Sequence, residues 1–558
     1  MERWRGTASL LLFAVACSSE SAPSHRAATV GAGGTAGSAN GAGGSGGKGG
    51  GQAGTGGVAG SATGGEAMSA GRGGAAGAGT GMSGGAGMQA SAGRAGGDAG
   101  SAHAGGTSAG GTESGGAGGT TVAGRGGAMQ GGQGGGSAGA SDLGPVGADG
   151  FAILAQLASD LRETAPTTVG IVRWSLQEPG LTEAHIDFGL DTTYGMTAPV
   201  ELAKADYRTV LVGMKPAKTY HFRVVASDGS RAFTSDDHTL TTGAPTTLVP
   251  IASYSIGAPD KLEKGFLIGS FWFGPAQHMA YILDPDGDIV WWFDDPKAGG
   301  RGVGRARLSA DGQDVWLVSD QNSGVVRRVS LDTLDFQSYD GTSASHDIAA
   351  VSGDTMAYVD ESESDCNSIF EIDKAGVTKE VFESDGLLGT SADEDCHANS
   401  VRYSKKTDLY AFSDRGRDVA VVDRSGVIRW KLSEKVSGGH DAWGKIQHGI
   451  HLLDDSILIF ANEADGDRQH SNAIEYGFDG SVVKKFTSRG GCDWFGDVQR
   501  LPGGNTLINY SCSGVIQEVD ASDNVVLEIK ASADGGGSWF GYSEFRRSLY
   551  GAPDDIQP

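Results

Sequence analysis

The chain has 558 residues, of which 95 are glycine, and its formal net charge at pH 7 is −25. Most of the glycines lie before residue 140, so about 410 residues remain for folded structure, too many for one compact β-sandwich. The acidic balance and the scattered lysines and arginines argue against nucleic acid as a partner.

The N-terminus has the pattern of a lipoprotein signal peptide, residues 1–17. Arg3 and Arg5 precede a short apolar stretch, residues 8–15, and small residues stand directly before Cys17. This lipobox predicts lipidation of Cys17, and the alternative is a plain secretory signal with an incidental cysteine. The apolar stretch is far shorter than the roughly 20 residues that span a bilayer. Because serine rather than aspartate follows Cys17, we expect an exported outer-membrane lipoprotein, periplasmic or on the cell surface, that meets the membrane only through its lipid.

Residues 18–145 form a linker of glycine, alanine, serine and threonine with almost no large apolar side chain. Such a segment cannot bury enough apolar surface to offset its chain entropy, so the composition predicts disorder. A glycine-rich coil of this length reaches on the order of 60 Å, which suits a spacer.

Residues 151–245 predict a small β-sandwich. We expect a short helix at 151–162, followed by alternating apolar and polar residues with turn signals about every ten residues. Tyr220 follows a proline-containing turn and opens a strand, which resembles the fibronectin type III pattern, and Tyr220 would be its corner tyrosine. Trp174 suits the core of this fibronectin III-like domain, whose usual role is spacing or adhesion.

Residues 251–550 repeat one hairpin pattern, in which a strand ends in an aspartate-containing turn and a second apolar strand follows. The copies lie at residues 282–291, 329–332, 370–377, 421–430, 476–482 and 518–525. Their spacing of about 40 to 55 residues is typical of four-stranded propeller blades, so six copies predict a six-bladed β-propeller. The turn at 284–288 looks like a calcium loop, but it lacks a distal glutamate and is better explained as a hairpin turn.

Four cysteines follow Cys17, an even number that suits disulfide bonds in an oxidising compartment. We favour Cys366 with Cys396 and Cys492 with Cys512, because each pair joins neighbouring segments, although four cysteines allow three connectivities. No pair has the CxxC spacing of a metal site, and we expect no bound metal.

Candidate catalytic residues stand just before the first strand of successive blades, where side chains point into the central funnel. His346, His397 and His448 hold this position in three consecutive blades, and Arg305 and Asp497 hold it in others. Each histidine alone is more often a structural residue than a catalyst. Three histidines at equivalent positions of consecutive blades predict a cluster in which the rings converge.

The same segments resemble the bacterial aryl-sulfate sulfotransferases, six-bladed propellers preceded by a β-sandwich. The resemblance covers about residues 251–550. It rests on Ser345-His346-Asp347, on His397-Ala-Asn399-Ser400, on Phe412-Ser-Asp-Arg415, on Gln447-His448 and on the segment 496–505. The order and spacing of these motifs are more specific than any one of them.

The resemblance implies a transferase that moves a sulfuryl group from an aryl sulfate to a phenol without a nucleotide donor or any other cofactor. His448 matches the histidine that attacks sulfur and carries the group in a ping-pong reaction. His346, His397 and Arg415 match the groups around it, which would hold the sulfuryl oxygens and move a proton. A solvated strand edge is the alternative role for Arg415.

Some residues depart from the family pattern or have less certain roles. The family often has an acidic residue after the nucleophile, whereas Gly449 follows His448 here, and His451 lies one pleat further and could share its role. Asn399, His451, Trp443 and Trp494 are candidates for substrate binding, although such tryptophans are more often core residues. The competing hypothesis is a non-catalytic propeller on a surface lipoprotein that binds a ligand or serves adhesion. Convergence of the histidines and Arg415 on one small volume would favour catalysis.

Overall fold

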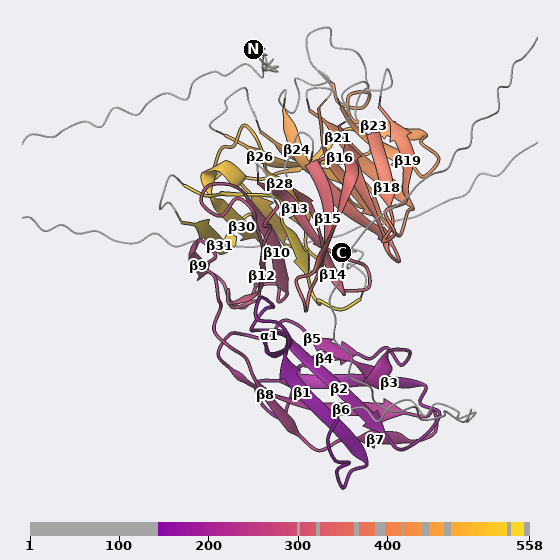
Figure 1. The fold of residues 1–558 in the computed structure, drawn as a ribbon. Coiled ribbons are helices and arrows are strands. Elements are labelled where there is room, and N and C mark those ends of the chain that lie inside the picture. Colours follow the sequence, from indigo (N-terminus) through magenta and orange to yellow (C-terminus); the bar gives the residue numbers. More distant parts are fainter. Residues whose placement is uncertain are drawn as a thin grey trace, which may run out of the picture. The chain divides into compact units, whose positions relative to one another are not determined.

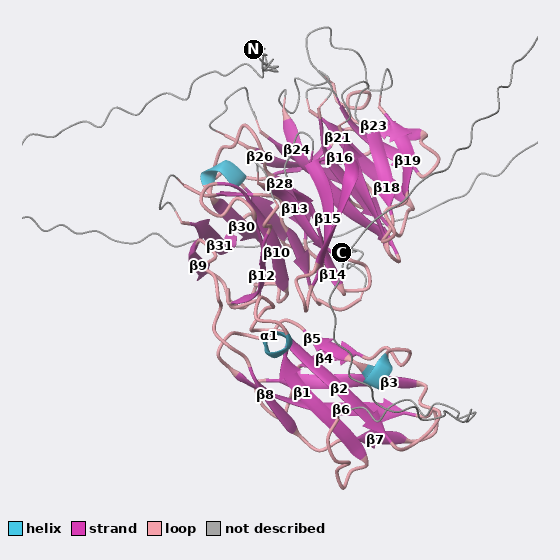
Figure 2. Ribbon diagram, in the orientation of Figure 1, coloured by secondary structure: helices cyan, strands magenta, loops and turns pink. Residues whose placement is uncertain are grey.

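The structure is a computed structural model, and nine segments of the chain are described. They are residues 143–297, 302–319, 324–361, 368–384, 397–415, 418–437, 446–462, 470–532 and 537–551. Cys17, most of the linker, the pair Cys366 and Cys396, and Trp443 lie outside them. The described part is all-β, with antiparallel sheets, one four-residue helix and short 3₁₀ turns (Figure 2). Within these segments, no helix has the length and apolar character needed to cross a membrane.

Two antiparallel sheets form the N-terminal part of the described chain (Figure 1). The first holds β1 (Phe151–Leu157), β2 (Gly170–Leu176) and β5 (Thr209–Leu211). The second holds β4 (Met196–Pro199), β3 (Glu183–Gly189), β6 (Thr219–Ser227), β7 (Ala232–Thr234) and β8 (His238–Thr241). Both sheets contribute to one hydrophobic core, in which Trp174 is fully buried. The hydroxyl of buried Tyr220 accepts the backbone N–H of Lys215 at 2.8 Å, which ties the turn to the strand that follows it.

The expected helix at 151–162 is mostly wrong. Residues 151–157 are strand β1, which pairs with β2 along its whole length, and only α1 (Ala158–Leu161) is helical. A free edge of β2 would leave backbone groups unpaired, so sheet pairing overrides the helical preference of this alanine- and leucine-rich segment.

The larger part of the chain consists of further antiparallel sheets. One holds β10 (Phe266–Phe273), β11 (Met279–Leu283), β12 (Ile289–Asp294), β32 (Trp539–Phe540) and β33 (Glu544–Arg546). A seven-stranded sheet holds β13 (Val303–Leu308), β14 (Asp314–Ser319), β15 (Gly324–Ser330), β16 (Phe336–Ser352), β17 (Thr355–Asp360), β18 (Ser368–Ile372) and β19 (Thr378–Glu383).

Three more sheets follow along the chain. They are β20 (Ala398–Ser404), β21 (Leu409–Asp414), β22 (Asp418–Asp423) and β23 (Ile428–Lys431); then β24 (Gln447–Leu452), β25 (Ser456–Ala461), β26 (Asn472–Gly477) and β27 (Val482–Lys485); then β28 (Asp497–Arg500), β29 (Thr506–Asn509), β30 (Val515–Val519), β31 (Val525–Ala531) and β9 (Ile251–Ile256). Five strands pack side by side, each against the next, in a propeller-like arrangement: β13, β16, β20, β24 and β28 (Figure 1). We call them the inner strands.

Both ends of this arrangement are interlocked. The early strand β9 completes the sheet of β28–β31, while the late strands β32 and β33 pair with β10. The chain therefore closes the circle of sheets twice.

The turn at 284–288 joins β11 to β12, and Asp284 Oδ1 accepts the backbone N–H groups of Asp286 and Asp288 at 3.0 and 2.8 Å, as a hairpin turn requires.

Four inner strands carry a register shift near their starts. The shifts lie between residues 303 and 305, 345 and 348, 398 and 400, and 448 and 450. Such bulges re-aim side chains. His346 lies in one of them with a φ of 53°, a left-handed conformation that costs free energy in a residue with a Cβ atom and is often found at functional sites.

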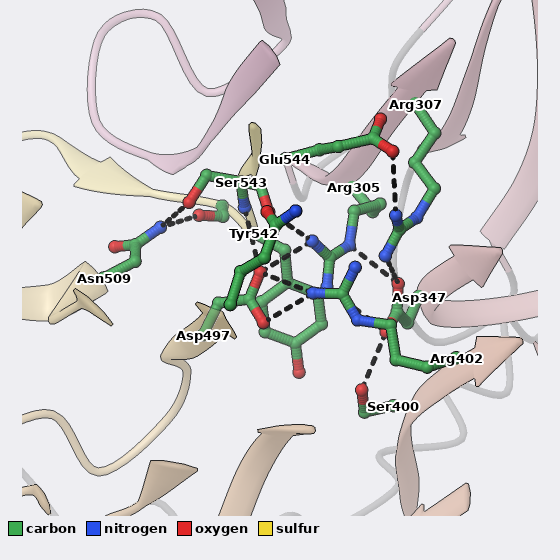
Figure 3. Close-up of polar contacts among 12 residues, drawn as sticks. Arg305, Arg307, Asp347, Ser400, Arg402, Asp497, Asn509, Tyr542, Ser543 and Glu544 are labelled. Carbon is green, nitrogen blue, oxygen red and sulfur yellow. Dashed lines mark hydrogen bonds and ion pairs between the residues drawn. The ribbon is translucent and has the colours of Figure 1, made fainter. Parts of the chain in front are cut away.

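A buried ionic network joins the inner strands close to these bulges (Figure 3). Arg305 is fully buried and donates from Nε to Asp347 Oδ1 at 2.7 Å and from Nη1 to Asp497 Oδ2 at 2.6 Å. Arg402 donates from Nη2 to both oxygens of Asp497, at 3.0 and 3.2 Å. Ser400 Oγ donates to Asp347 at 2.8 Å. Strands β13, β16, β20 and β28 are therefore held together by two arginines and two aspartates, whose charges balance.

The network generates a prediction about stability. Replacing Asp497 with asparagine leaves two buried guanidinium groups short of negative charge, so we expect a loss of about 3–5 kcal/mol in the free energy of unfolding. Denaturant titration followed by circular dichroism measures this loss. Glu383→Gln, the same chemical change at an exposed position of β19, is the matched control, and an equal effect of the two substitutions would contradict the role of the network.

Candidate active site

Three histidine rings from neighbouring inner strands lie together at one end of the network. The centroid of the His346 ring is 4.9 Å from that of His397 and 5.9 Å from that of His448. His346 and His448 are each 1% exposed, whereas His397 is partly exposed. The structure therefore brings together the three histidines that occupy equivalent positions in the sequence pattern. We call them the histidine cluster.

The neutral form of His448 is oriented by Asn462. His448 Nδ1 lies 2.8 Å from Asn462 Oδ1, and Asn462 Nδ2 donates to the carbonyls of Cys492 and Phe495 at 2.6 and 2.8 Å. Because the amide nitrogen is used by two carbonyls, the amide oxygen faces the imidazole and Nδ1 must carry the proton. The lone pair of His448 is then on Nε2.

The surroundings of His448 keep it uncharged. Burial lowers its pKa to about 3, and the charges of Arg415 and His397 act in the same direction, against the hydrogen bond that His448 donates to Asn462. A neutral imidazole with a fixed tautomer is a nucleophile over the whole range above that pKa.

His397 and Arg415 are positioned as a unit. The backbone N–H of His397 donates to Asp414 Oδ1 at 2.9 Å, and the backbone N–H of Arg415 donates to the His397 carbonyl at 2.9 Å. The side chain of His397 faces a carboxylate, with 3.1 Å between Nδ1 and Glu361 Oε1. This pairing orients the ring, and an imidazole beside a carboxylate suits a group that gives and takes a proton.

The space beside Gly449 is already filled. A Cβ atom at this position would lie 2.4 Å from Asp497 Oδ1 and 2.5 Å from Asp497 Cα. No acidic side chain fits there, because the network residue occupies the space. Asn462, on the neighbouring strand, supplies the partner that an acidic residue after His448 would otherwise provide.

Aromatic rings form one wall of the histidine cluster. Phe495 stacks on His346 and on His448, with centroids 5.3 and 5.9 Å apart, and also contacts Trp272 and Tyr542 at 4.7 and 4.6 Å. Trp494, the residue that the sequence suggested for this wall, is 55% exposed. The other predicted tryptophan, Trp443, lies outside the described residues.

The remaining predicted site residues lie elsewhere. Asn399 is buried and donates from Nδ2 to the Gln447 carbonyl at 2.6 Å, so it holds the residue next to His448. His451 faces inward two ladder positions from His448, but its Nδ1 accepts the backbone N–H of Arg500 at 2.9 Å. It lines a cavity that includes none of the histidine cluster.

Sequence reasoning missed Asn462 and Glu361, and it named Phe495 only together with Trp494 as a candidate for the aromatic wall. Phe495 lies in the Trp-Phe dipeptide whose tryptophan was chosen, and Asn462 and Glu361 directly follow the ends of β25 and β17, the strands that pair with the inner strands. That shared position is the signal that could have found the last two. A disulfide joins Cys492 to Cys512, next to the carbonyls that bind Asn462.

Within the described segments, no group of three or more histidine, cysteine, aspartate or glutamate side chains is arranged to hold a metal ion.

No protein-family model matches the chain, and no curated protein matches it either. Among solved structures, it is similar to a streptogramin B lyase at 11% identity, with 53% of this chain and 98% of that one covered and a TM-score of 0.35. A virginiamycin B lyase from Staphylococcus aureus has 12% identity, coverage of 68% and 99%, and a TM-score of 0.31. A protein of unknown function from Bacteroides thetaiotaomicron has 12% identity, coverage of 67% and 94%, and a TM-score of 0.32. Scores this low carry no argument about what this chain does.

The low pKa of His448 predicts how stability depends on pH. The folded-state pKa is about 3 and the ordinary value is 6.5, so the unfolded chain binds more protons between these values and stability falls as pH falls. This histidine contributes a slope of up to about 1.4 kcal/mol per pH unit. His448→Phe should flatten the pH profile of the unfolding free energy between pH 6.5 and 3. Superimposable profiles for the two proteins would show that His448 is protonated in the folded state.

Proposed function

We propose that this protein is an aryl sulfotransferase that moves a sulfuryl group from an aryl sulfate to a phenol through a sulfohistidine at His448, without a nucleotide donor. The observation that carries the proposal is the buried, neutral His448, whose Nε2 lone pair is set by Asn462 beside two further histidines. The resemblance to the aryl-sulfate sulfotransferases supports it from the sequence.

The two half-reactions use the residues of the site in turn. His448 Nε2 attacks the sulfur of the aryl sulfate, the sulfur–oxygen bond breaks, and the departing phenolate takes a proton from His397. The acceptor phenol then gives its proton to His397 and attacks the sulfur, and the nitrogen–sulfur bond breaks. Arg415 and His346 stabilise the charge on the sulfuryl oxygens in both steps. Phe495 supplies an aromatic face beside the reacting group.

We also propose that the larger part of the chain is a six-bladed propeller. The seven-stranded sheet would be two blades that share the long strand β16, and the inner strand of the first blade would come from β32 and β33.

For the two N-terminal sheets we propose a fibronectin III-like domain. The hydrogen bond between the buried Tyr220 hydroxyl and the Lys215 backbone supports this proposal. Upstream of it we propose an exported chain lipidated at Cys17, in the outer membrane, with residues 18–142 as a spacer.

The activity assay follows from these roles. The full-length protein, given a chromogenic aryl sulfate and phenol, should release the chromophore in a phenol-dependent way, and His448→Ala should abolish release. A mass increase of one sulfuryl group on His448, seen when donor is supplied without acceptor, should identify the intermediate.

The matched control for this assay is His185→Ala, a change at a partly exposed histidine on β3 of the N-terminal sheets, which should leave release unchanged. Release by His448→Ala at the wild-type rate would remove His448 from the nucleophilic role. Absence of any release by a folded wild-type protein would favour the non-catalytic binding role instead.

Asn462 gives a prediction about the tautomer. Asn462→Ala removes the acceptor for Nδ1–H, so His448 samples the wrong tautomer and kcat should fall by roughly two orders of magnitude, with little change in KM. Asn462→Asp keeps an acceptor for the same proton and should retain most of the activity, with its pH profile shifted because a carboxylate raises the pKa of His448.

Nitrogen-15 NMR of the histidine ring reports this effect independently of activity. Wild type and Asn462→Asp should show a protonated Nδ1 on His448, and Asn462→Ala should show a mixture of tautomers. A single Nε2–H tautomer in the wild type would contradict the assignment.

A further inference from the structure

A second cavity lies at the other end of the ionic network from the histidine cluster. Its volume is about 290 Å³, and its lining includes Arg307, Arg402, Lys405, His451 and Glu544. The first of these follows Arg305 by two residues on β13, and His451 follows the network-facing Gly449 by two residues on β24. The network residues fill the space between the two ends. We call this the distal cavity.

Buried hydrogen-bond donors in the distal cavity are left unused. Arg307 is 5% exposed, and it donates from Nε to the Ile348 carbonyl and from Nη1 to Glu544 Oε1 at 3.2 Å. Its buried Nη2 lies 3.8 Å from Asp347 Oδ1, within ion-pair range, but makes no hydrogen bond. Arg402 uses Nε and Nη2 on the Ile450 carbonyl and Asp497. Its Nη1 makes no hydrogen bond with the described residues.

His451 adds a further donor. Because its Nδ1 accepts the backbone N–H of Arg500, its remaining proton is on Nε2. Burial, with the positive charges of Arg307, Arg500 and Arg305, lowers the pKa of His451 to about 3 against the opposing charge of Asp497, so the ring is a neutral donor. Against these three donors stands one unused buried acceptor, Glu544 Oε2.

The charges of the lining also leave a positive excess. Asp311 and Asp454, the other acids of the cavity wall, are paired with Lys374 and Lys406, each at 2.5 Å, and neither lysine lines the cavity. Lys405 has no ion-pair partner among the described residues. Burial and the charge of Arg305 lower the pKa of Arg307, against the opposing charges of Glu544, Asp347 and Asp497.

Part of the wall is apolar. Ala349, Ala350, Val351, Leu452 and Phe545 line the same cavity. A site with unused buried donors, excess positive charge and an apolar wall fits a ligand with an oxyanion at one end and a small hydrophobic body at the other.

We propose that the distal cavity is a second ligand site, which binds a small organic oxyanion such as an aryl or alkyl carboxylate. The oxyanion accepts hydrogen bonds from Arg307 Nη2 and His451 Nε2, and the apolar body packs against Val351 and Leu452. Since the ionic network lies between this site and the histidine cluster, the bound molecule does not reach His448 and is not its substrate. The site is independent of the sulfotransferase proposal.

The test uses 4-fluorobenzoate as the probe and the full-length protein. Fluorine NMR titration should show saturable binding to the wild type. The double substitution Arg307→Gln and Glu544→Gln removes the unused donor and its partner together, so no buried charge is left unpaired, and binding should weaken at least about tenfold. His448→Ala, at the other end of the network, should leave the affinity unchanged.

A second pair of variants keeps the test decisive if the double variant does not fold. Lys405→Gln changes an exposed lysine of the cavity rim and should weaken binding about threefold. Lys379→Gln, the same change at an exposed position of β19, should have no effect. The proposal is overturned by absence of saturable binding, by equal affinity in the Lys405 and Lys379 variants, or by loss of binding in His448→Ala alone.

Discussion

The structure depends on one buried constraint, the pairing of Arg305 and Arg402 with Asp347 and Asp497 along the axis of the inner strands. Each of these charges would be costly to bury alone, so the four residues must be present together and in register. Each comes from a different strand, and pairing them fixes how the three sheets that hold these strands are placed against one another. Hydrophobic contacts between neighbouring sheets are less directional and would tolerate small slides.

The network also determines what can stand next to it. Asp497 occupies the space beside Gly449, which excludes a side chain there, and the bulges of the inner strands lie one step away, where they turn His346 and His448 toward each other. The tautomer of His448 consequently cannot be set from its own strand. It is set from the paired strand by Asn462, whose amide is in turn held by the carbonyls of Cys492 and Phe495. Ionic packing and nucleophile orientation are thus parts of one arrangement.

Sequence reasoning found the inner-strand histidines because their position repeats with each hairpin turn, and repetition survives without knowledge of contacts. It did not find Asn462 or Glu361, because each acts across a strand pair and has no repeating signal of its own. It placed His451 on the correct face, since the bulge at Gly449 leaves it two ladder positions from His448. It could not predict that the ionic network lies between the rings of His448 and His451. The sequence of one strand does not show which side chains the neighbouring strands place next to it. The early helix at 151–162 failed for the same reason, since the partner of β1 begins thirteen residues after β1 ends.

The two ends of the axis therefore have opposite chemistry for a shared physical reason. The network is balanced, with two positive and two negative groups, so it contributes little net field to either side. At one end burial can then hold His448 neutral, with Arg415 as the nearby positive charge that an oxyanion would require. At the other end Arg307 and Arg402 each have a guanidinium nitrogen that makes no hydrogen bond with the described residues, beside the cavity for which we propose an anionic ligand. A network with unequal charges would shift the electrostatic potential in the same direction at both ends. A balanced network lets a neutral nucleophile and a cationic cavity lie within a few residues of each other on the same strands.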